Sequence, residues 1–586
     1  MSQDQDNVVA RECRFSWHIP ERNGHNPDLH LVKEIVHLKD GTTEPRLRWI
    51  KDFKRSLYIT RPNKRTHKDK REWEELGNVL EKKVTQSDLR MSVARLLDKG
   101  WSKDHLKKLA QSPYLYGTDI SSTSLIKKMY QDRFPTANTP FNVATYDIES
   151  DVVRGTEEVI IVSVIYKNKV HIAVTEEFIR GIACIEEVFQ RAVNKYIGDY
   201  VTKRNLEINL YVAKDVIDLI DSGFKKVHEW KPDFLAIWNM DYDIPKILSM
   251  FEKYDIDPRD VLCDPSIPKE LRFCKYVQGP KKKVTAAGKV IPINPAAQWH
   301  TLQLAASFYV IDAMCAYKHI RLGEQEEPSY SLDAILQKKL GIRKLKFQEA
   351  DDYVGLRWHQ VMQRDFKVEY MVYNIFDSLS MIELDESTND LSSTLPTFSA
   401  TSDFWNFKSQ PRRIADALHF YALDNGYVMG TVGSVDAPKE KEIDEDDVSD
   451  DDSSDGEEEA VAEEHQTLDR RGWVITLPAH MSVLGLKLVL EDPGLHTNIR
   501  AFVYDSDATS AYPSATSVAN VSKRTTRKEI ISIEGIDEYD FRMQNLNLVV
   551  GRVNSIEYAT EMFKFPKPEE LLTQFVLNNI QEKTHG

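Results

Sequence analysis

Hydrophobic positions between residues 141 and 390 follow two different periods. Three short apolar runs are typical of strands: FNVATYDIE (141–149), VIIVSVIYK (159–167) and FLAIW (234–238). The second run is almost continuously apolar, which predicts a strand covered on both faces. A helical period occupies residues 185–203. Strands that alternate with helices predict an α/β domain over residues 141–390.

A second helix is predicted from the spacing in RDFKVEYMVYNIFDSLSMIEL (364–384). Large apolar side chains recur every three or four residues from Phe366 to Leu384, and Asp377 falls on the same stripe. An acid on an inward-facing stripe is costly to bury unless it has a partner. Tyr373 lies one turn earlier on that face, where it could orient a water molecule or simply pack in the core.

Three more acids occupy informative positions. Asp147 and Glu149 are two residues apart in a predicted strand, so both side chains point to one side and could hold a cation between them. The alternative is an exposed pair at a strand end. Asp243 precedes Pro245, which is predicted to open a helix, so this acid is a candidate either for the N-cap or for a metal ligand. Together with Asp377, these carboxylates predict a site for two divalent cations, Mg²⁺ or Mn²⁺.

The charge of the chain is concentrated in one segment. The 586 residues carry a formal net charge of −15, and residues 440–464 hold fifteen Asp and Glu against one Lys, which is −14. The remainder is therefore close to neutral, and the net charge does not argue against a DNA-binding protein. Five cysteines without a CxxC pair, no apolar run of membrane-spanning length and a polar start predict a cytoplasmic protein without a membrane partner.

Two basic segments are candidates for contact with nucleic acid. The range Lys51–Arg71 contains nine Lys and Arg against two Asp, with aromatic residues between them; a solvated basic face is an equally good alternative. Lys281, Lys282 and Lys283 stand among glycines and a proline and next to β-branched residues, which predicts a basic β-hairpin.

The ordered motifs DIE (147–149), WNMDYDIP (238–245), PSYSLD (328–333) and YNIFD (373–377) resemble the exonuclease motifs of B-family DNA polymerases, especially those of T-even-type bacteriophages. The resemblance implies an RNase H-like 3′–5′ exonuclease domain. It also implies that Asp147, Glu149, Asp243 and Asp377 bind two metal ions and that Tyr373 positions the hydrolytic water. The basic segment with Lys281, Lys282 and Lys283 matches the place of a family hairpin that contacts DNA and helps to separate strands.

A second motif, DATSAYPS (507–514), resembles motif A of the B-family palm. By that resemblance Asp507 binds the catalytic metals, Ser510 and Ala511 face the triphosphate, and Tyr512 packs beneath the sugar. Ala511 replaces the usual leucine. The fingers motif and the second palm aspartate do not occur in the sequence, so we expect proofreading, but no synthesis, by this chain alone.

The sequence predicts a multidomain α/β protein with an N-terminal domain (1–140), an α/β domain (141–390) and an acidic disordered insertion (437–466). The resemblance implies that the α/β domain is the exonuclease domain, that residues 391–436 return to the N-terminal domain or form a linker, and that residues 467–586 are a partial palm. The expected function is that of a B-family DNA polymerase subunit in phage replication. A truncated polymerase and a non-synthesising DNA-binding or regulatory fragment are the alternatives. Expected partners are primer–template DNA, single-stranded 3′ ends, a second subunit with the missing motifs, dNTPs in its presence, and a sliding clamp. The expected location is the host cytoplasm.

Overall fold

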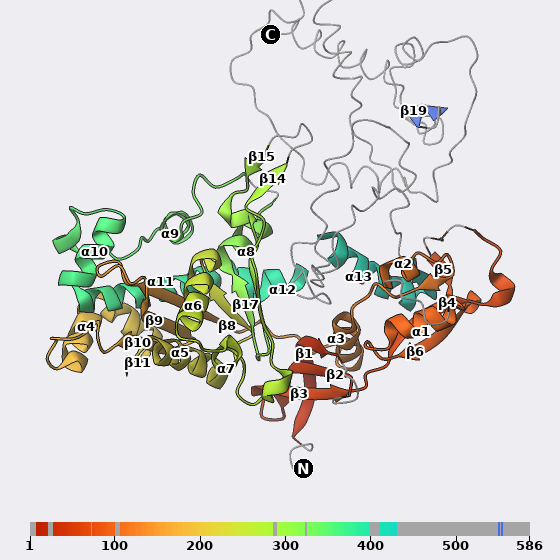
Figure 1. Cartoon of the computed structure of the whole chain (residues 1–586), viewed down its shortest axis with the longest axis horizontal. Coiled ribbons are helices and arrows are strands. Elements are labelled where there is room, and N and C mark those ends of the chain that lie inside the picture. The colour runs from red at the N-terminus through yellow and green to blue at the C-terminus, as the bar shows by residue number, and fades with distance from the viewer. Residues whose placement is uncertain are drawn as a thin grey trace, which may run out of the picture. The chain divides into compact units, whose positions relative to one another are not determined.

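The computed structural model describes residues 7–20, 27–68, 70–71, 73–99, 106–284, 290–322, 325–398, 410–430, 549–550 and 553–554 (Figure 1). Internal contacts divide the chain into two compact units, Met1–Glu458 and Glu459–Gly586. In the second unit only the antiparallel pair β19 (Val549–Val550) and β20 (Val553–Asn554) is described. The acidic insertion and the palm residues Asp507, Ser510, Ala511 and Tyr512 lie outside the described residues.

An eight-stranded mixed sheet is the largest element of the first unit, and the fold is mixed α/β. The strand order is β11-β10-β9-β8-β12-β17-β16-β13. The central strands β8, β12 and β17 are parallel, and β9, β10 and β16 each make an antiparallel pair. The bounds are β8 (Val143–Ser150), β9 (Val159–Tyr166), β10 (Lys169–Thr175), β11 (Glu207–Ala213), β12 (Phe234–Ile237), β13 (Cys274–Val277), β16 (Thr301–Leu304) and β17 (Tyr309–Asp312).

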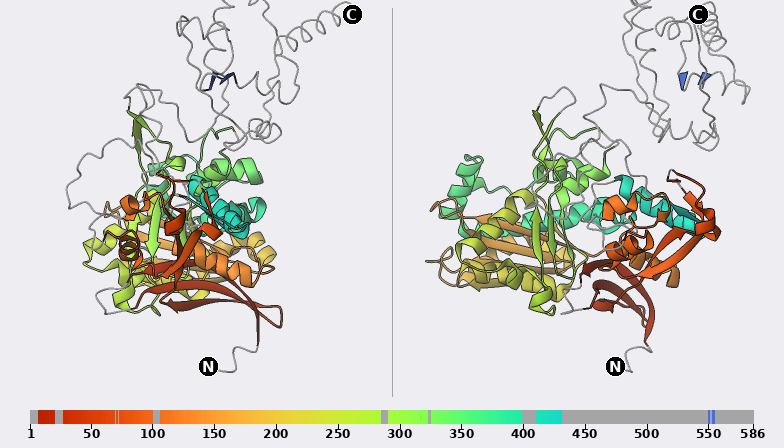
Figure 2. Two further views of the ribbon diagram at one scale, coloured as in Figure 1. Left: turned by 90° about the vertical axis from the view of Figure 1, so that its right-hand side faces the viewer. Right: turned by 45° about the vertical axis from the view of Figure 1, so that its right-hand side comes forward.

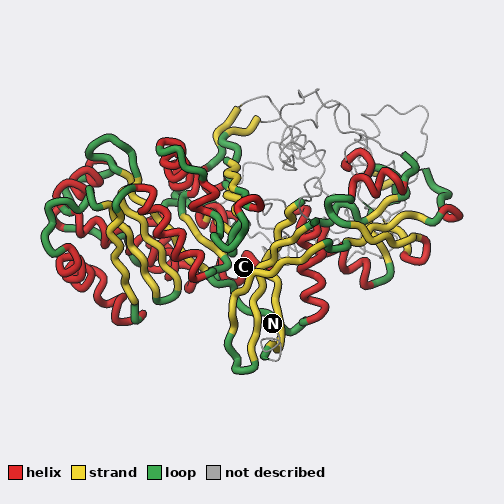
Figure 3. Tube along the Cα trace, turned by 60° about the horizontal axis from the view of Figure 1, so that its bottom comes forward, coloured by secondary structure: helices red, strands yellow, loops and turns green. Residues whose placement is uncertain are grey.

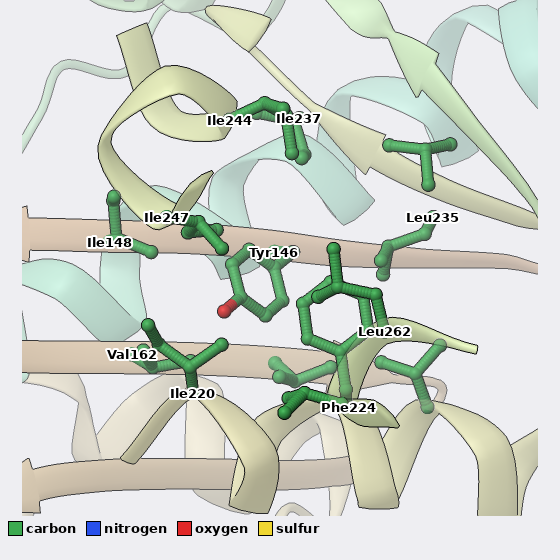
Figure 4. Packing of buried hydrophobic residues seen from close by; sticks show 14 of the residues in the cluster. Tyr146, Ile148, Val162, Ile220, Phe224, Leu235, Ile237, Ile244, Ile247 and Leu262 are labelled. Atoms are coloured by element: carbon green, nitrogen blue, oxygen red, sulfur yellow. The ribbon is translucent and has the colours of Figure 1, made fainter. Parts of the chain in front are cut away.

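Helices cover both faces of this sheet (Figures 1 and 2). One face packs against α5 (Val216–Trp230), α6 (Met240–Lys253) and α7 (Pro258–Leu262), and the other against α4 (Ile185–Arg204) and α11 (Lys367–Thr388), with α10 (Leu356–Asp365) beside α11. Tyr146 and Ile148 point from β8 into the core beneath α5 and α6 (Figure 4). Because strand side chains alternate, Asp147 and Glu149 face α11 instead.

The predicted strands and the helix at 185–203 are confirmed. Seven of the eight residues of β9 are buried, as its continuous apolar run predicts. The helix predicted over 364–384 is two helices, because α10 ends at Asp365 and α11 starts at Lys367 after the non-helical Phe366.

Smaller sheets form the N-terminal part of the unit (Figure 3). The strands β1 (Val8–Ile19), β2 (Leu29–Leu38) and β3 (Thr43–Lys51) pair antiparallel, and α3 (Ser122–Arg133) packs on β1. A second sheet has the strand order β6-β4-β7, and its strands are β4 (Arg55–Thr60), β6 (Val79–Val84) and β7 (Leu115–Tyr116). The helices α1 (Leu89–Leu96) and α2 (Leu106–Ala110) lie between β6 and β7 in the chain. The strand β18 (Tyr427–Met429), which follows α13 (Gln410–Asp424), pairs with β5 (Trp73–Glu75).

The remaining elements lie mostly between or beside these sheets. They are α8 (Ala313–Ile320), α9 (Leu332–Leu340), α12 (Leu395–Phe398), the 3₁₀ turns Pro62–Lys64, Leu76–Asn78, Lys269–Leu271, Pro295–Ala297 and Gln348–Ala350, and the π turn Asp390–Thr394. The predicted basic hairpin is confirmed as β14 (Lys282–Val284) paired with β15 (Val290–Pro292).

The basic stretch Lys51–Arg71 contains both exposed and buried cations. Arg55 is buried on β4 and donates to the carbonyl of Gly117 at 2.8 Å. Arg61, Arg65 and Lys70 also donate to backbone carbonyl oxygens. Several of these cations therefore stabilise the local fold, and they do so because buried carbonyls need donors.

Candidate metal centre and its surroundings

Three carboxylates converge at one point between the sheet and α11. Asp147 and Glu149 come from β8, and Asp377 comes from the middle of α11. A single oxygen from each of the three lies within 4.8 Å of the other two. Asp377 is 4% exposed, while the other two are half-buried. The strand period and the helix stripe that predicted these positions are therefore both realised, and the three acids are brought together as predicted.

Asp243 approaches the same centre from α6 but stands outside this closest group of three. The helix begins at Met240 with Asn239 as its N-cap residue, so Pro245 lies inside the helix and the prediction that it opens the helix is wrong. The Asp243 amide donates to the Asn239 carbonyl at 3.2 Å, as an internal helical residue does. Capping by Asp243 is excluded, and its buried carboxylate remains available to a ligand.

Burial is the main cause of the raised pKa values of the four acids, and repulsion between neighbouring carboxylates adds to it for Asp147, Glu149 and Asp243. Burial raises the pKa of Asp147 well above its ordinary value, and the charges of Asp243, Asp377 and Glu149 raise it further. Burial also raises the pKa of Glu149 to about 8, against an opposing hydrogen bond from Tyr370. The pKa of Asp243 is raised by burial and then by Glu149 and Asp312. Such a cluster is costly to ionise without a compensating cation.

Lys344 is the cation that the chain itself supplies, and the sequence reasoning missed it. Its Nζ lies 2.6 Å from Asp377 Oδ2 and donates to Tyr373 Oη at 3.2 Å. Burial alone would lower the pKa of Lys344, but the facing carboxylates, Asp377 first, raise it, so the amine is charged. No spacing distinguishes this residue within RKLKF (343–347), because its role depends on a loop that follows α9.

The motif PSYSLD holds that loop in place. Ser331 caps α9 by accepting from the Ala334 amide at 3.4 Å. Asp333 Oδ1 accepts from the Lys344 backbone amide at 2.9 Å, and Asp333 Oδ2 accepts from Arg343 at 2.9 Å. Asp333 thus acts on the centre indirectly, by fixing the backbone that carries Lys344.

Side chains on α10 and α11 orient the strand acids. Asn374 Nδ2 donates to Asp147 Oδ2 at 2.6 Å, and the Tyr370 hydroxyl donates to Glu149 Oε2. His359 Nδ1 lies 2.7 Å from the same Tyr370 hydroxyl. The rings of Tyr370 and Tyr373 stack at 5.9 Å with an interplanar angle of 2°. Asn374 sits inside the YNIFD motif and Tyr370 on the apolar stripe, so helical spacing could have identified both as neighbours of Asp377.

The base of the basic hairpin is attached to the first turn of α6. Lys281 Nζ lies 2.9 Å from Asp241 Oδ2, and Gln278 Nε2 donates to Asp241 Oδ1 at 2.5 Å. Lys282 and Lys283 are exposed on β14 and form no ion pair within the described part of the chain. Asp241 therefore connects the exposed lysines to the helix that carries Asp243.

A scan against protein-family models finds no match for this chain, and a search of the curated proteins finds none either. Within the described ranges, no helix combines the length and the apolar character needed to cross a membrane.

Proposed function

We propose that this chain is a metal-dependent 3′–5′ exonuclease of the proofreading type found in B-family DNA polymerases, built on an RNase H-like domain. The observation that carries the proposal is the convergence of Asp147, Glu149 and Asp377, with Asp243 beside them, on one buried point. Acids from separate elements that raise one another's pKa values are typical of metal-assisted phosphodiester hydrolysis.

The residues fit divalent cations such as Mg²⁺ or Mn²⁺. The donors are carboxylate oxygens, which hard cations prefer. Asp377 Oδ1 is buried and has no hydrogen-bond partner within the described residues, so an oxygen remains free to bind. Asp147, Glu149, Asp243 and Asp377 would hold the ions. When bound, two such cations lower the pKa of an attacking water and stabilise the leaving 3′ oxygen.

The neighbouring side chains have distinct roles in the proposed reaction. Tyr373 places its hydroxyl beside the Asp377 carboxylate and Lys344, where it can orient a water molecule. Lys344 opposes the rise that burial causes in the pKa of Asp377, and it adds positive charge next to the scissile phosphate. Tyr370 and Asn374 fix the carboxylates of β8. Lys281, Lys282 and Lys283 contact the phosphates of the DNA strand.

The proposal extends to a polymerase assembly in phage replication. Asp507, Ser510, Ala511 and Tyr512 would contribute one half of a palm site, and a second polypeptide would contribute the other acid, the fingers and the thumb. Primer–template DNA and dNTPs would bind only to that assembly, with a sliding clamp as a further partner. Primer extension with and without a candidate second chain tests this part, and extension by this chain alone would contradict it.

The nuclease is tested on a 5′-labelled single-stranded oligonucleotide in Mg²⁺. The wild-type chain should shorten it from the 3′ end one nucleotide at a time, and the double variant Asp147→Ala/Asp377→Ala should not. Asp352→Ala removes an exposed acid and is the matched control, with activity equal to wild type. Undiminished cleavage by the double variant would refute the assignment.

A further inference from the structure

A cavity of about 760 Å³ lies in the N-terminal part of the first unit, among β1, β3 and the end of α3. Figure 1 shows α3 beside β1 and β2. The proposed nuclease does not use this cavity, since none of its acids lines it. The lining residues are Val8, Val9, Arg11, Arg48, Ile50, Phe53, Met129, Tyr130, Arg133 and Phe134.

Three arginines and no acid are among the residues that line the cavity. The buried Glu34, 2% exposed, lies behind them on β2 and accepts a hydrogen bond from Arg11. Arg48 Nη1 is 3.9 Å from the same carboxylate. One carboxylate therefore faces two arginines, and the cavity keeps an excess of positive charge.

Arg133 adds the third cation from the last turn of α3. Its guanidinium lies 5.3 Å from the Phe134 ring centroid, and it forms no ion pair with any residue that the structure describes. Its side chain is exposed, as is that of Arg48. Both guanidinium groups can therefore reach an anion in the cavity, and guanidinium is the side chain best suited to bidentate phosphate binding.

The other walls are apolar and aromatic. Phe53, Tyr130 and Phe134 offer ring surfaces, and Val9 and Met129 are 60% and 43% exposed. The Tyr130 ring is fixed, because its hydroxyl donates to Glu34 Oε2 at 2.9 Å. Exposed apolar groups beside arginines match a ligand with a flat apolar part and an anionic part.

We propose that this cavity binds a nucleotide unit, with its phosphate on Arg48 and Arg133 and its base against the aromatic wall. The volume is in the range of about 300–1,000 Å³ that is usual for small-molecule sites. The unit comes from one of two sources, a free nucleoside 5′-monophosphate or one nucleotide of a single strand. The binding needs no divalent metal, because arginines supply the charge, and it does not depend on the proposed nuclease.

Isothermal titration of the full chain with dAMP in EDTA tests the site, since EDTA removes metal-dependent binding at the acids. We expect wild type to bind dAMP, and Arg48→Gln/Arg133→Gln to bind it at least tenfold more weakly. Arg180→Gln, which removes an exposed arginine outside the cavity, is the control and should bind like wild type. Both Arg variants should retain the nuclease, so failure here is separable from failure of the proposed function.

Two further titrants identify the source. An oligo(dT) strand that binds more tightly than dAMP, with the same loss in the arginine variant, assigns the site to single-stranded nucleic acid. Tighter binding of dAMP assigns it to the free nucleotide. Absence of binding by both, or equal binding by wild type and the arginine variant, overturns the proposal. The proposal is also overturned if dAMP does not bind but a peptide of residues 440–464 does, and if that binding depends on Arg48 and Arg133.

Discussion

Two groups of buried acids in the first unit differ in how their charge is compensated. Asp233 immediately precedes β12 and is 0% exposed, and Lys33 Nζ lies 2.8 Å from its Oδ1. Arg14 Nε is 3.5 Å from Oδ2, and the Asn142 amide donates to Oδ2 at 2.8 Å. Burial alone would raise the pKa of Asp233, but Lys33 and Arg14 outweigh it and hold the pKa below its ordinary value.

The acids of the candidate metal centre are the opposite case. Asp147 on β8 is surrounded by three other carboxylates, and Lys344 opposes the rise in its pKa. The charge of Asp233 is compensated by Lys33 and Arg14, and this acid joins the N-terminal sheet to the large sheet. A cluster of acids without compensating charges lowers the stability of the fold when no ligand is bound, and binding of a ligand raises that stability. Compensation, rather than burial, separates a structural acid from a candidate functional one.

The largest expected effect is on activity. Asp147→Asn should reduce Mg²⁺-dependent exonuclease activity by about 10³-fold or more, since it removes a carboxylate that would hold the cation. Its thermal stability in EDTA should be equal to or above that of wild type, because one repelling charge is lost. Activity is measured on labelled single strands and stability by thermal unfolding. A marked fall in stability would show that Asp147 is a structural acid like Asp233.

The next effect is on stability. Asp233→Asn should cost about 3 kcal/mol, because it leaves the buried Lys33 ammonium without its carboxylate. The control Asp132→Asn removes an exposed acid paired with Lys128 and should cost about 0.5 kcal/mol or less. Urea unfolding measures both. The folded Asp233→Asn protein should keep its nuclease activity, and loss of activity without loss of stability would break the distinction between the two groups.

Lys344→Met should lower exonuclease activity about 30-fold, which corresponds to about 2 kcal/mol. Lys344 lowers the pKa values of Asp147 and Glu149, so its loss should move the acidic limb of the pH–rate profile to higher pH. The exposed Lys346→Met is the control and should leave the profile in place. A uniform loss of rate at every pH would mean that Lys344 only supports the loop.

The smallest effect is the pH dependence of stability without metal. Glu149 has a pKa of about 8 in the fold against 4.5 ordinarily, so between these values the folded state binds the extra proton. Stability in EDTA should therefore fall by about 1–2 kcal/mol as the pH rises from 5 to 8. Mn²⁺ should restore it, and more strongly at pH 8 than at pH 5.5. Asp233→Asn should keep this slope, whereas Asp147→Asn should reduce it, as thermal unfolding at each pH can show.

The pattern of residues along the chain was sufficient to predict features that lie within a single strand or hairpin. The continuous apolar run predicted the buried β9, and the strand period placed Asp147 and Glu149 on one side of β8. The glycine-rich basic segment predicted the hairpin of β14 and β15. Pattern failed at Pro245, because α6 begins five residues earlier at Met240 and continues through the proline. For Lys51–Arg71 the charge count could not reveal which cations would donate to backbone carbonyl oxygens.

The sequence by itself determined the types of element, the four acids and their order along the chain. Only the tertiary structure decided that Lys344 faces Asp377, that Asn374 and Tyr370 orient the strand acids, and that Asp233 is neutralised by Lys33 from a different sheet. The physical reason is that periodicity is a property of neighbours in sequence. Compensation of a buried charge depends on groups that are tens to hundreds of residues away, and it is fixed when the sheets and helices pack.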